Sequence, residues 1–292
     1  MTKTTDPVAL AEWVVIGRRE DLRPGRPWRT RVLGQPIECQ RLADGALRAV
    51  EIDADGRHGA PLQARERYGH VWVTFSGNPR PMLEIAEFDE QPPRRYLGWG
   101  GVKVRTSPQR LVENFLDMGH FAFVHTDVLG AEPHTEIRDY QVETRQALGE
   151  VWATRCLAWQ PKASSAAGGG RDVEYVYRTS GPFVVLLYKT AERPGTFDNL
   201  GMLVQPMEED HCCVWGYTLL LESETADSEA LHFQQSIFQQ DRLILEHQTP
   251  RRIPLHDASE TPARADAAAI AYRRWMREAG MRFGIQPKAA EA

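Results

Sequence analysis

The sequence predicts an α+β fold, with a small β-rich unit over residues 1–95 and an antiparallel sheet with helices over residues 96–292. Short alternating or β-branched runs dominate the first unit. Five further strand-like runs follow between residues 151 and 221. Helical patterns are confined to the stretch after Ser107 and to the last third of the chain. Strands grouped together, with helices outside them, are typical of α+β proteins rather than of alternating α/β folds.

The first unit is predicted as a set of short strands separated by turns. Gly, Pro and Asp-Gly punctuation bounds each apolar run, which is the usual mark of strand ends. A Pro-rich stretch over 79–96 then predicts a connector rather than a strand. The predicted strands cover residues 12–17, 28–34, 36–45, 46–52 and 69–75.

The second unit is predicted to open with a strand over 97–106 and a helix that begins near Ser107. Ser107 can cap this helix, and Pro108 suits its first position. A second helix is expected from about Asp227, and a last one over 263–280, with Gly280 as its stop. The Gly- and Ala-rich run 162–171 predicts a surface loop. The strands between the helices are expected at 151–159, 173–181, 183–191, 199–207 and 211–221.

Composition excludes several classes of function. The 292 residues are 42% hydrophobic and 26% charged, which is ordinary for a globular protein. The formal net charge of -5, without a basic block, argues against nucleic acid as a partner. No apolar run approaches the roughly 20 residues that a membrane span needs. A polar N-terminus and four cysteines without C-x-x-C spacing complete the expectation of a cytoplasmic protein.

The segment "ENFLDMGHFAFVHTDVLG" (113–130) raises the question of a metal site, because it holds Asp117, His120 and His125. Two histidines and one carboxylate form the facial triad of many ferrous enzymes. Five residues on a regular helix correspond to a rotation of about 140°. Both imidazoles can therefore reach one ion only if the helix breaks near Gly119 or His125, whereas Asp117 and His120 share a face.

A third ligand would have to come from elsewhere, and Asp241 in "FQQDRLILEHQ" (238–248) is the candidate. It lies in the middle of a predicted helix with an apolar stripe. The alternative is a solvated carboxylate paired with Arg242 or another arginine. Spacing leaves both interpretations open.

These two segments resemble the iron-binding segments of the Rieske non-heme iron oxygenases. The stretch 111–130 is similar to that family's D-x-x-H-x-x-x-x-H motif, and 265–276 is similar to the closing helix of its vanillate demethylase-like branch. The resemblance implies a helix-grip-like catalytic domain in which Fe(II) is bound by His120, His125 and Asp241. It further implies that Asp117 couples the iron to the incoming electron.

The resemblance also implies that Asn114 or Glu113 supports the iron-binding helix by hydrogen bonding near the iron. On position only, the candidates to line the substrate pocket are Phe121, Val124, Leu186 and Tyr188.

The resemblance is incomplete in the first unit. The family's N-terminal domain binds a [2Fe-2S] cluster through C-x-H and C-x-x-H, yet no cysteine here has a histidine two or three residues later. Only 53–63, with the isolated His58, occupies the place of the cluster loops. Residues 1–95 are therefore expected to be a degenerate Rieske-like domain, and the cluster is expected in trans, from a Rieske-containing reductase or oxygenase subunit.

The resulting hypothesis is a mononuclear iron oxygenase with O2 as co-substrate. It is expected to remove an N- or O-methyl group from a small aromatic or heteroaromatic substrate as formaldehyde, as cluster-less N-demethylating members of the family do. A trimer or mixed oligomer is expected. Two alternatives stay open: a non-catalytic subunit of a mixed oxygenase oligomer, and a zinc-dependent binding or hydrolytic protein.

Overall fold

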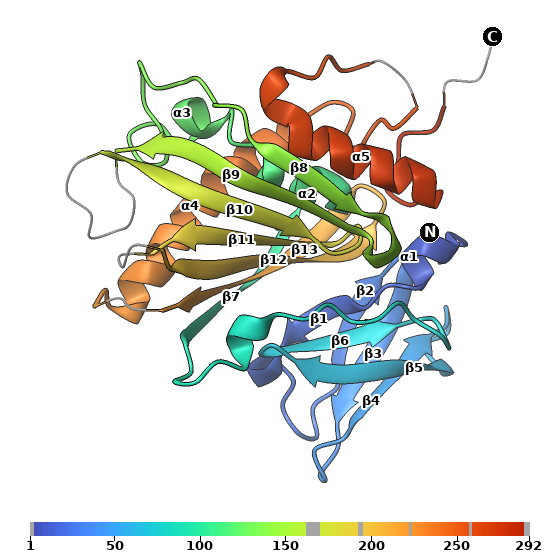
Figure 1. The fold of residues 1–292 in the computed structure, drawn as a ribbon. Coiled ribbons are helices and arrows are strands. Elements are labelled where there is room, and N and C mark those ends of the chain that lie inside the picture. Colours follow the sequence, from blue (N-terminus) through green and yellow to red (C-terminus); the bar gives the residue numbers. More distant parts are fainter. Residues whose placement is uncertain (1–2, 162–169, 192–194, 222–223, 257–258, 289–292) are drawn as a thin grey trace.

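The computed structural model describes residues 3–161, 170–191, 195–221, 224–256 and 259–288 (Figure 1). Most of the loop predicted over 162–171 lies outside these residues. The structure contains two antiparallel sheets with the long helices grouped against the second. The predicted α+β class is confirmed. No helix in the described part of the chain combines the length and apolar character that a bilayer-spanning helix needs.

The first sheet has six strands in the order β1-β6-β5-β4-β3-β2, all paired antiparallel. A short helix, α1 (Pro7–Leu10), precedes it and is capped by Asp6, whose carboxylate accepts from the amide of Val8 at 2.9 Å. The strands are β1 (Val14–Arg18), β2 (Trp28–Val32), β3 (Gln35–Arg41), β4 (Leu47–Ile52), β5 (His58–Arg67) and β6 (His70–Thr74), with 3-10 turns at Arg19–Asp21 and Ala86–Phe88.

Strand β5 is the one element of this sheet that sequence patterns did not predict. Its residues, HGAPLQARER, carry few apolar side chains and are mostly exposed. The strand forms because its backbone pairs with β4 on one side and with β6 on the other. Such pairing does not require apolar and polar residues to alternate along the strand. The second half of the segment expected to replace the cluster loops is thus part of a ten-residue strand, which begins at His58 with an exposed ring near Glu38.

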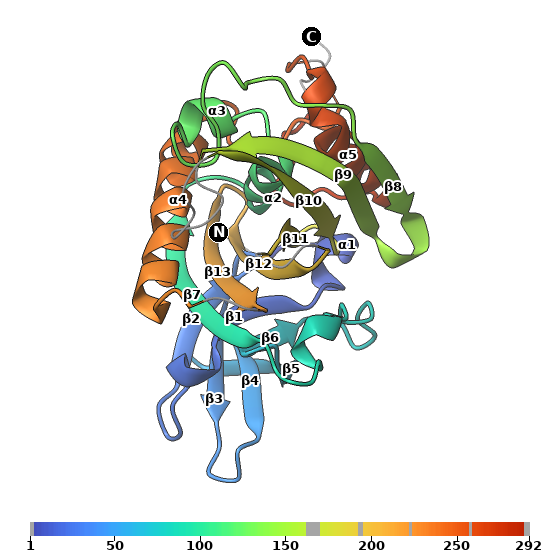
Figure 2. The ribbon, with the colours of Figure 1, turned by 60° about the vertical axis from the view of Figure 1, so that its left-hand side comes forward.

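The second sheet has seven antiparallel strands in the order β7-β13-β12-β11-β10-β9-β8 and curls around α2 (Figure 2). Helix α4 lies against β7, and α5 lies against β8 and β9. The elements are β7 (Arg95–Val104), α2 (Pro108–Leu116), α3 (Phe121–Val124), β8 (Gln141–Arg145), β9 (Glu150–Gln160), β10 (Arg171–Thr179), β11 (Val184–Thr190), β12 (Phe197–Glu208), β13 (His211–Leu220), α4 (Asp227–His247) and α5 (Ala267–Ala279), with 3-10 turns at Gln146–Leu148 and Arg264–Asp266.

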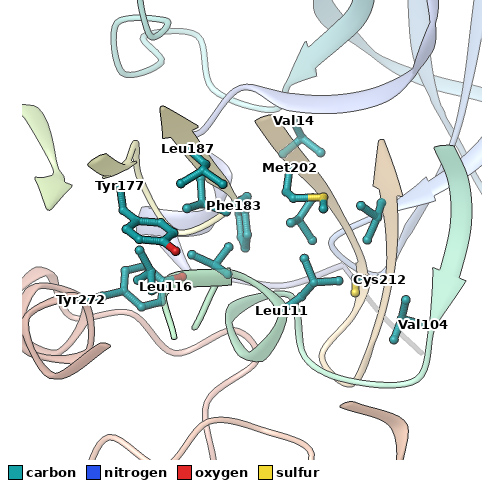
Figure 3. Packing of buried hydrophobic residues seen from close by; sticks show 14 of the residues in the cluster. Val14, Val104, Leu111, Leu116, Tyr177, Phe183, Leu187, Met202, Cys212 and Tyr272 are labelled. Carbon is teal, nitrogen blue, oxygen red and sulfur yellow. The ribbon is translucent and has the colours of Figure 1, made fainter. Parts of the chain in front are cut away.

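The main core lies between the concave face of the second sheet and α2. Leu111 and Leu116 of α2 pack with Leu187 and Met202 of the sheet, and Tyr272 of α5 closes the side (Figure 3). The opposite face of the same strands is also apolar. Trp215 and Leu186 pack there against Trp72 and other residues of the first unit. Two buried faces explain why β11 to β13 read as nearly continuous apolar runs.

The two sheets are joined by polar contacts as well as by this second apolar layer. The Gln205 amide donates to Thr30 Oγ1 at 2.7 Å and to the carbonyl of Arg31 at 2.9 Å, while its oxygen accepts from Trp215 Nε1 at 3.0 Å. The strands of the first sheet all precede β7. The division into two domains, 1–95 and 96–292, stays a prediction, because the sheets share this packed interface.

Candidate metal centre

The predicted break in the helix is present, and it follows α2 directly. Ser107 caps α2, accepting from the amide of Arg110 at 3.3 Å, and the helix ends at Leu116. Asp117 is extended, with φ -87° and ψ 130°, and a new turn of helix, α3, runs only from Phe121 to Val124. The two histidines flank that turn, His120 immediately before it and His125 immediately after it. The turn brings both imidazoles to one point, which a continuous helix could not do.

Three donor atoms meet at this point. His120 Nε2 lies 3.2 Å from His125 Nε2, and Asp241 Oδ1 lies 3.3 Å and 3.0 Å from these two nitrogens. Asp241 reaches the histidines from α4 and is only 8% exposed. Arg242, the alternative partner considered for Asp241, pairs instead with Glu246. The structure therefore brings together the three residues predicted as ligands, from two segments more than 100 residues apart.

The spacing and charge of these atoms fit a divalent metal ion. For metal–ligand bonds of roughly 2.1 Å, separations of 3.0–3.3 Å correspond to angles of roughly 90 to 105° at the ion, as on one face of an octahedron. Two carboxylates, Asp117 and Asp241, surround the two imidazoles, so a divalent cation would balance the local charge. Two imidazoles and one carboxylate on one face of an octahedron, with the other positions open, are the donor set typical of non-heme Fe(II).

The other nitrogen of each imidazole is held by a hydrogen bond. His120 Nδ1 donates to Asp117 Oδ2 at 3.0 Å, and His125 Nδ1 donates to Gln240 Oε1 at 2.7 Å. Each bond holds a proton on Nδ1 and directs Nε2 at the metal position, where a metal ion would replace any proton on that nitrogen. Sequence patterns gave no sign of Gln240, because a glutamine in a helix is ordinary and its contact with His125 spans 115 residues.

Electrostatic coupling within the group is strong. Burial lowers the pKa of His120, but the carboxylates of Asp117 and Asp241 on either side outweigh it and raise that pKa to about 9. Burial by itself would raise the pKa values of Asp117 and Asp241. Their hydrogen bonds with the histidines outweigh this effect, and both pKa values are lowered. A site that holds a proton this firmly is one that favours positive charge.

Of the two residues predicted to support the helix, only Asn114 contacts a candidate ligand. Its amide lies 3.4 Å from Asp241 Oδ1. The Glu113 carboxylate turns away to Arg110, at 3.2 Å, and to Arg273 of α5, at 2.8 Å. Glu260 completes this partly buried ion cluster, which ties α2 to α5. Glu113 therefore holds α2 through this ion cluster and contacts none of the three donor residues, although it lines the same outer cavity as His120 and Asp241.

The donor triad lies between two cavities. An outer cavity of about 460 Å³ is lined by Asp117 together with charged residues such as Arg273 and Asp266. An inner, mostly apolar cavity lies beneath the curled sheet. Asn114, His120 and Asp241 line both cavities, so the metal position is accessible from either side.

The expected pocket residues are partly wrong. Phe121 lines the inner cavity, but Val124 lines the outer one. Leu186 and Tyr188 point to the opposite face of the sheet, against the first unit, because side chains alternate along β11. Leu187 and Lys189 face the inner cavity instead.

Replacing Gln240 by leucine tests its contact with His125. The Nδ1 proton of His125 would lose its acceptor, the ring would lose its fixed orientation, and affinity for Fe(II) should fall roughly 10- to 100-fold. Anaerobic metal titration measures this. Gln239→Leu, at the exposed neighbouring position, is the matched control and should bind metal like the native chain. Equal affinity in both variants would show that the hydrogen bond does not position His125.

Comparison with known proteins agrees with this geometry. Residues 104–282, more than half of the chain, match the family described as "Vanillate O-demethylase oxygenase C-terminal domain". The chain is 42% identical over 274 residues to a protein of Pseudomonas sp. (strain TJI-51) named "Probable methylxanthine N7-demethylase NdmC". That match covers 94% of this chain and 95% of the relative.

Two solved structures share the fold at low identity. Pseudomonas putida CBB5 NdmA with caffeine has a TM-score of 0.76 at 18% identity and covers 93% of this chain and 91% of its own. Dicamba monooxygenase bound to 3,6-dichlorosalicylic acid has a TM-score of 0.74 at 16% identity and covers 94% and 98%. Together with the match over 104–282, these findings confirm the predicted resemblance, and the chain belongs to the vanillate O-demethylase-type family of non-heme iron oxygenases.

Proposed function

We propose that this chain is the iron-binding component of an oxygenase that removes an N-methyl group from a small methylated heteroaromatic, of the oxopurine type. The observation that supports this most is the triad of His120, His125 and Asp241 between a charged outer cavity and an apolar inner one. Substrate and electrons can then reach the same centre from opposite sides. The relative that is 42% identical, named a probable methylxanthine N7-demethylase, supports the substrate class.

The overall reaction balances as follows. The N-methyl compound, O2, two electrons and two protons give the N-hydroxymethyl compound and water. In the N–CH2OH carbinolamine the C–N bond then breaks and the hydroxyl proton moves to the ring nitrogen, which releases formaldehyde and the demethylated product. Ferrous iron, when bound by the triad, would supply the activation of O2. The aromatic side chains around the inner cavity exclude water and hold the flat substrate.

The two electrons must come from a separate protein. We propose a Rieske-containing reductase or oxygenase subunit, because residues 1–95 provide no cysteine–histidine set for a cluster. Asp117 offers the entry point. Its carboxylate lines the outer cavity and is 28% exposed, and it accepts a hydrogen bond from His120. Asp117 therefore links the protein surface to a ligand of the proposed iron. A donor docked over the outer cavity would contact this carboxylate.

The experiment that tests the function combines the Fe(II)-loaded chain with a Rieske-containing reductase, NADH and O2. Formaldehyde and demethylated product are measured over a panel of N-methyl heteroaromatics and O-methyl aromatics. A parallel reaction replaces donor and O2 by hydrogen peroxide, which already carries the oxygen, two electrons and two protons. Iron-dependent formaldehyde from an N-methyl heteroaromatic is expected. An iron-free chain without turnover in either reaction would favour a non-catalytic subunit instead.

A further inference from the structure

Apart from the donor triad and two amide side chains, the described wall of the inner cavity is apolar and aromatic, and it carries one lysine. Among the described residues that line it, Lys189 is the single lysine or arginine. Lys189 lies on β11, two residues after Leu187, and therefore on the same face of the strand. Phe121, Tyr175 and Phe238 are among the rings that make up much of the remaining wall.

Lys189 is connected to the metal position through aromatic rings. Its partner across the ladder on β10 is Tyr175. The Tyr175 ring lies 6.0 Å from that of Phe121, edge to face, and Phe121 lies 5.1 Å from the imidazole of His120. Lys189 and the donor triad are thus parts of one cavity wall, and the aromatic rings of Tyr175 and Phe121 lie between them.

The Lys189 ammonium can bind a ligand in addition to its partners within the protein. Asp198 lies directly across from Lys189 on β12. Burial lowers the pKa of Lys189 to about 8, while Asp198 raises it and Arg171 lowers it further, so the side chain is mostly protonated at neutral pH. An ammonium carries three N–H donors and no acceptor. It can interact with Asp198 and still donate to an oxygen of a bound ring.

The size of the inner cavity sets a limit on that ring. The space open to the centre of a water molecule is about 70 Å³. This space is much smaller than the corresponding space of the outer cavity, about 460 Å³, so the inner cavity favours a small one- or two-ring compound over a larger ligand.

We propose that Lys189 determines substrate specificity by donating a hydrogen bond to an acceptor oxygen on the substrate ring, which holds the ring with its N-methyl group toward the donor triad. The inference rests on the proposed function and specifies it. The substrate class is a planar heteroaromatic that bears a ring carbonyl. An aromatic carboxylate presents the same acceptor oxygen, and the test below separates the two.

The test compares Lys189→Met with Lys103→Met, which makes the same change at an exposed position of β7. Dissociation constants are measured by calorimetry on the iron-loaded chain under nitrogen. The probes are 7-methylxanthine, 7-methylpurine, which lacks the carbonyl oxygens, and 4-methoxybenzoate. Lys189→Met should raise the dissociation constant of 7-methylxanthine at least about 10-fold and that of 7-methylpurine less than about 3-fold. Lys103→Met should change neither dissociation constant.

The outcomes separate this inference from the proposed function. Unchanged binding of 7-methylxanthine to Lys189→Met overturns the role of Lys189, even if the native chain releases formaldehyde. Binding of 7-methylpurine as tight as that of 7-methylxanthine to the native chain overturns it too. If Lys189→Met loses only the binding of 4-methoxybenzoate, the proposal is overturned as well, because Lys189 then recognises an aromatic carboxylate and not a ring carbonyl. Absent turnover with every N-methyl compound refutes the proposed function instead. If Lys189→Met does not fold, Lys189→Gln provides the same comparison with a weaker, neutral donor.

Discussion

Asp241→Ala should abolish iron loading while the chain still folds. The substitution removes one of three donor atoms, and the two imidazoles of His120 and His125 that remain come from one segment. Since losing a hydrogen-bonded neighbour of a ligand already weakens metal binding about 10- to 100-fold, losing a ligand should weaken it more. Bound iron after anaerobic loading should fall to background. His120→Ala should behave in the same way.

The fold should survive because the substitution leaves no buried carboxylate without a partner. Thermal unfolding gives a second measurement. Saturating Fe(II) should stabilise the native chain by about 2.7 kcal/mol at 100 times the dissociation constant, and should not stabilise the variants. Asp227→Ala, the same change at an exposed position in the first turn of α4, is the control and should load iron normally. Native iron content in both ligand variants would refute the assignment of the triad.

Local patterns were sufficient to predict the elements that carry the site. The Ser107 cap, Pro108 at the first helical position and the stop at Gly280 are all present. The need for a break near Gly119 followed from the 3.6-residue period alone, since two histidines five apart cannot share a helical face. What periodicity could not provide was the approach of Asp241, which depends on α4 packing beside α2. That expectation came from the family resemblance.

The errors have equally specific causes. Val184 to Tyr188 is apolar at every position, so nothing in the pattern tells which residues of β11 face the cavity. An error of one residue in the direction of the side chains led to the prediction of Leu186 and Tyr188, whereas Leu187 and Lys189 face the cavity. Strand β5 was missed because pairing on both sides, not burial, defines it. Gln240 was missed because its function lies in a contact with a residue distant in sequence.

Asp117→Asn should keep the iron but remove turnover with the Rieske donor. The asparagine oxygen can still accept from His120 Nδ1, so the imidazole keeps its orientation and iron loads at saturating concentration. The negative charge facing the outer cavity is lost, and with it a charge-assisted contact to an incoming donor. The rate of formaldehyde release should fall on the order of 100-fold. Asp266→Asn, which neutralises another carboxylate of the same cavity, should change this rate little.

Hydrogen peroxide distinguishes electron entry from a local role of Asp117. Because peroxide brings its own electrons, the Asp117→Asn chain should release formaldehyde with peroxide at nearly the native rate, while the donor-dependent reaction stays slow. If Asp117 only orients His120, both reactions should fall together and iron affinity should fall with them. If the donor-dependent rate survives, electrons enter elsewhere. The difference between the two rates therefore measures whether the carboxylate at the outer cavity connects the proposed iron to its partner.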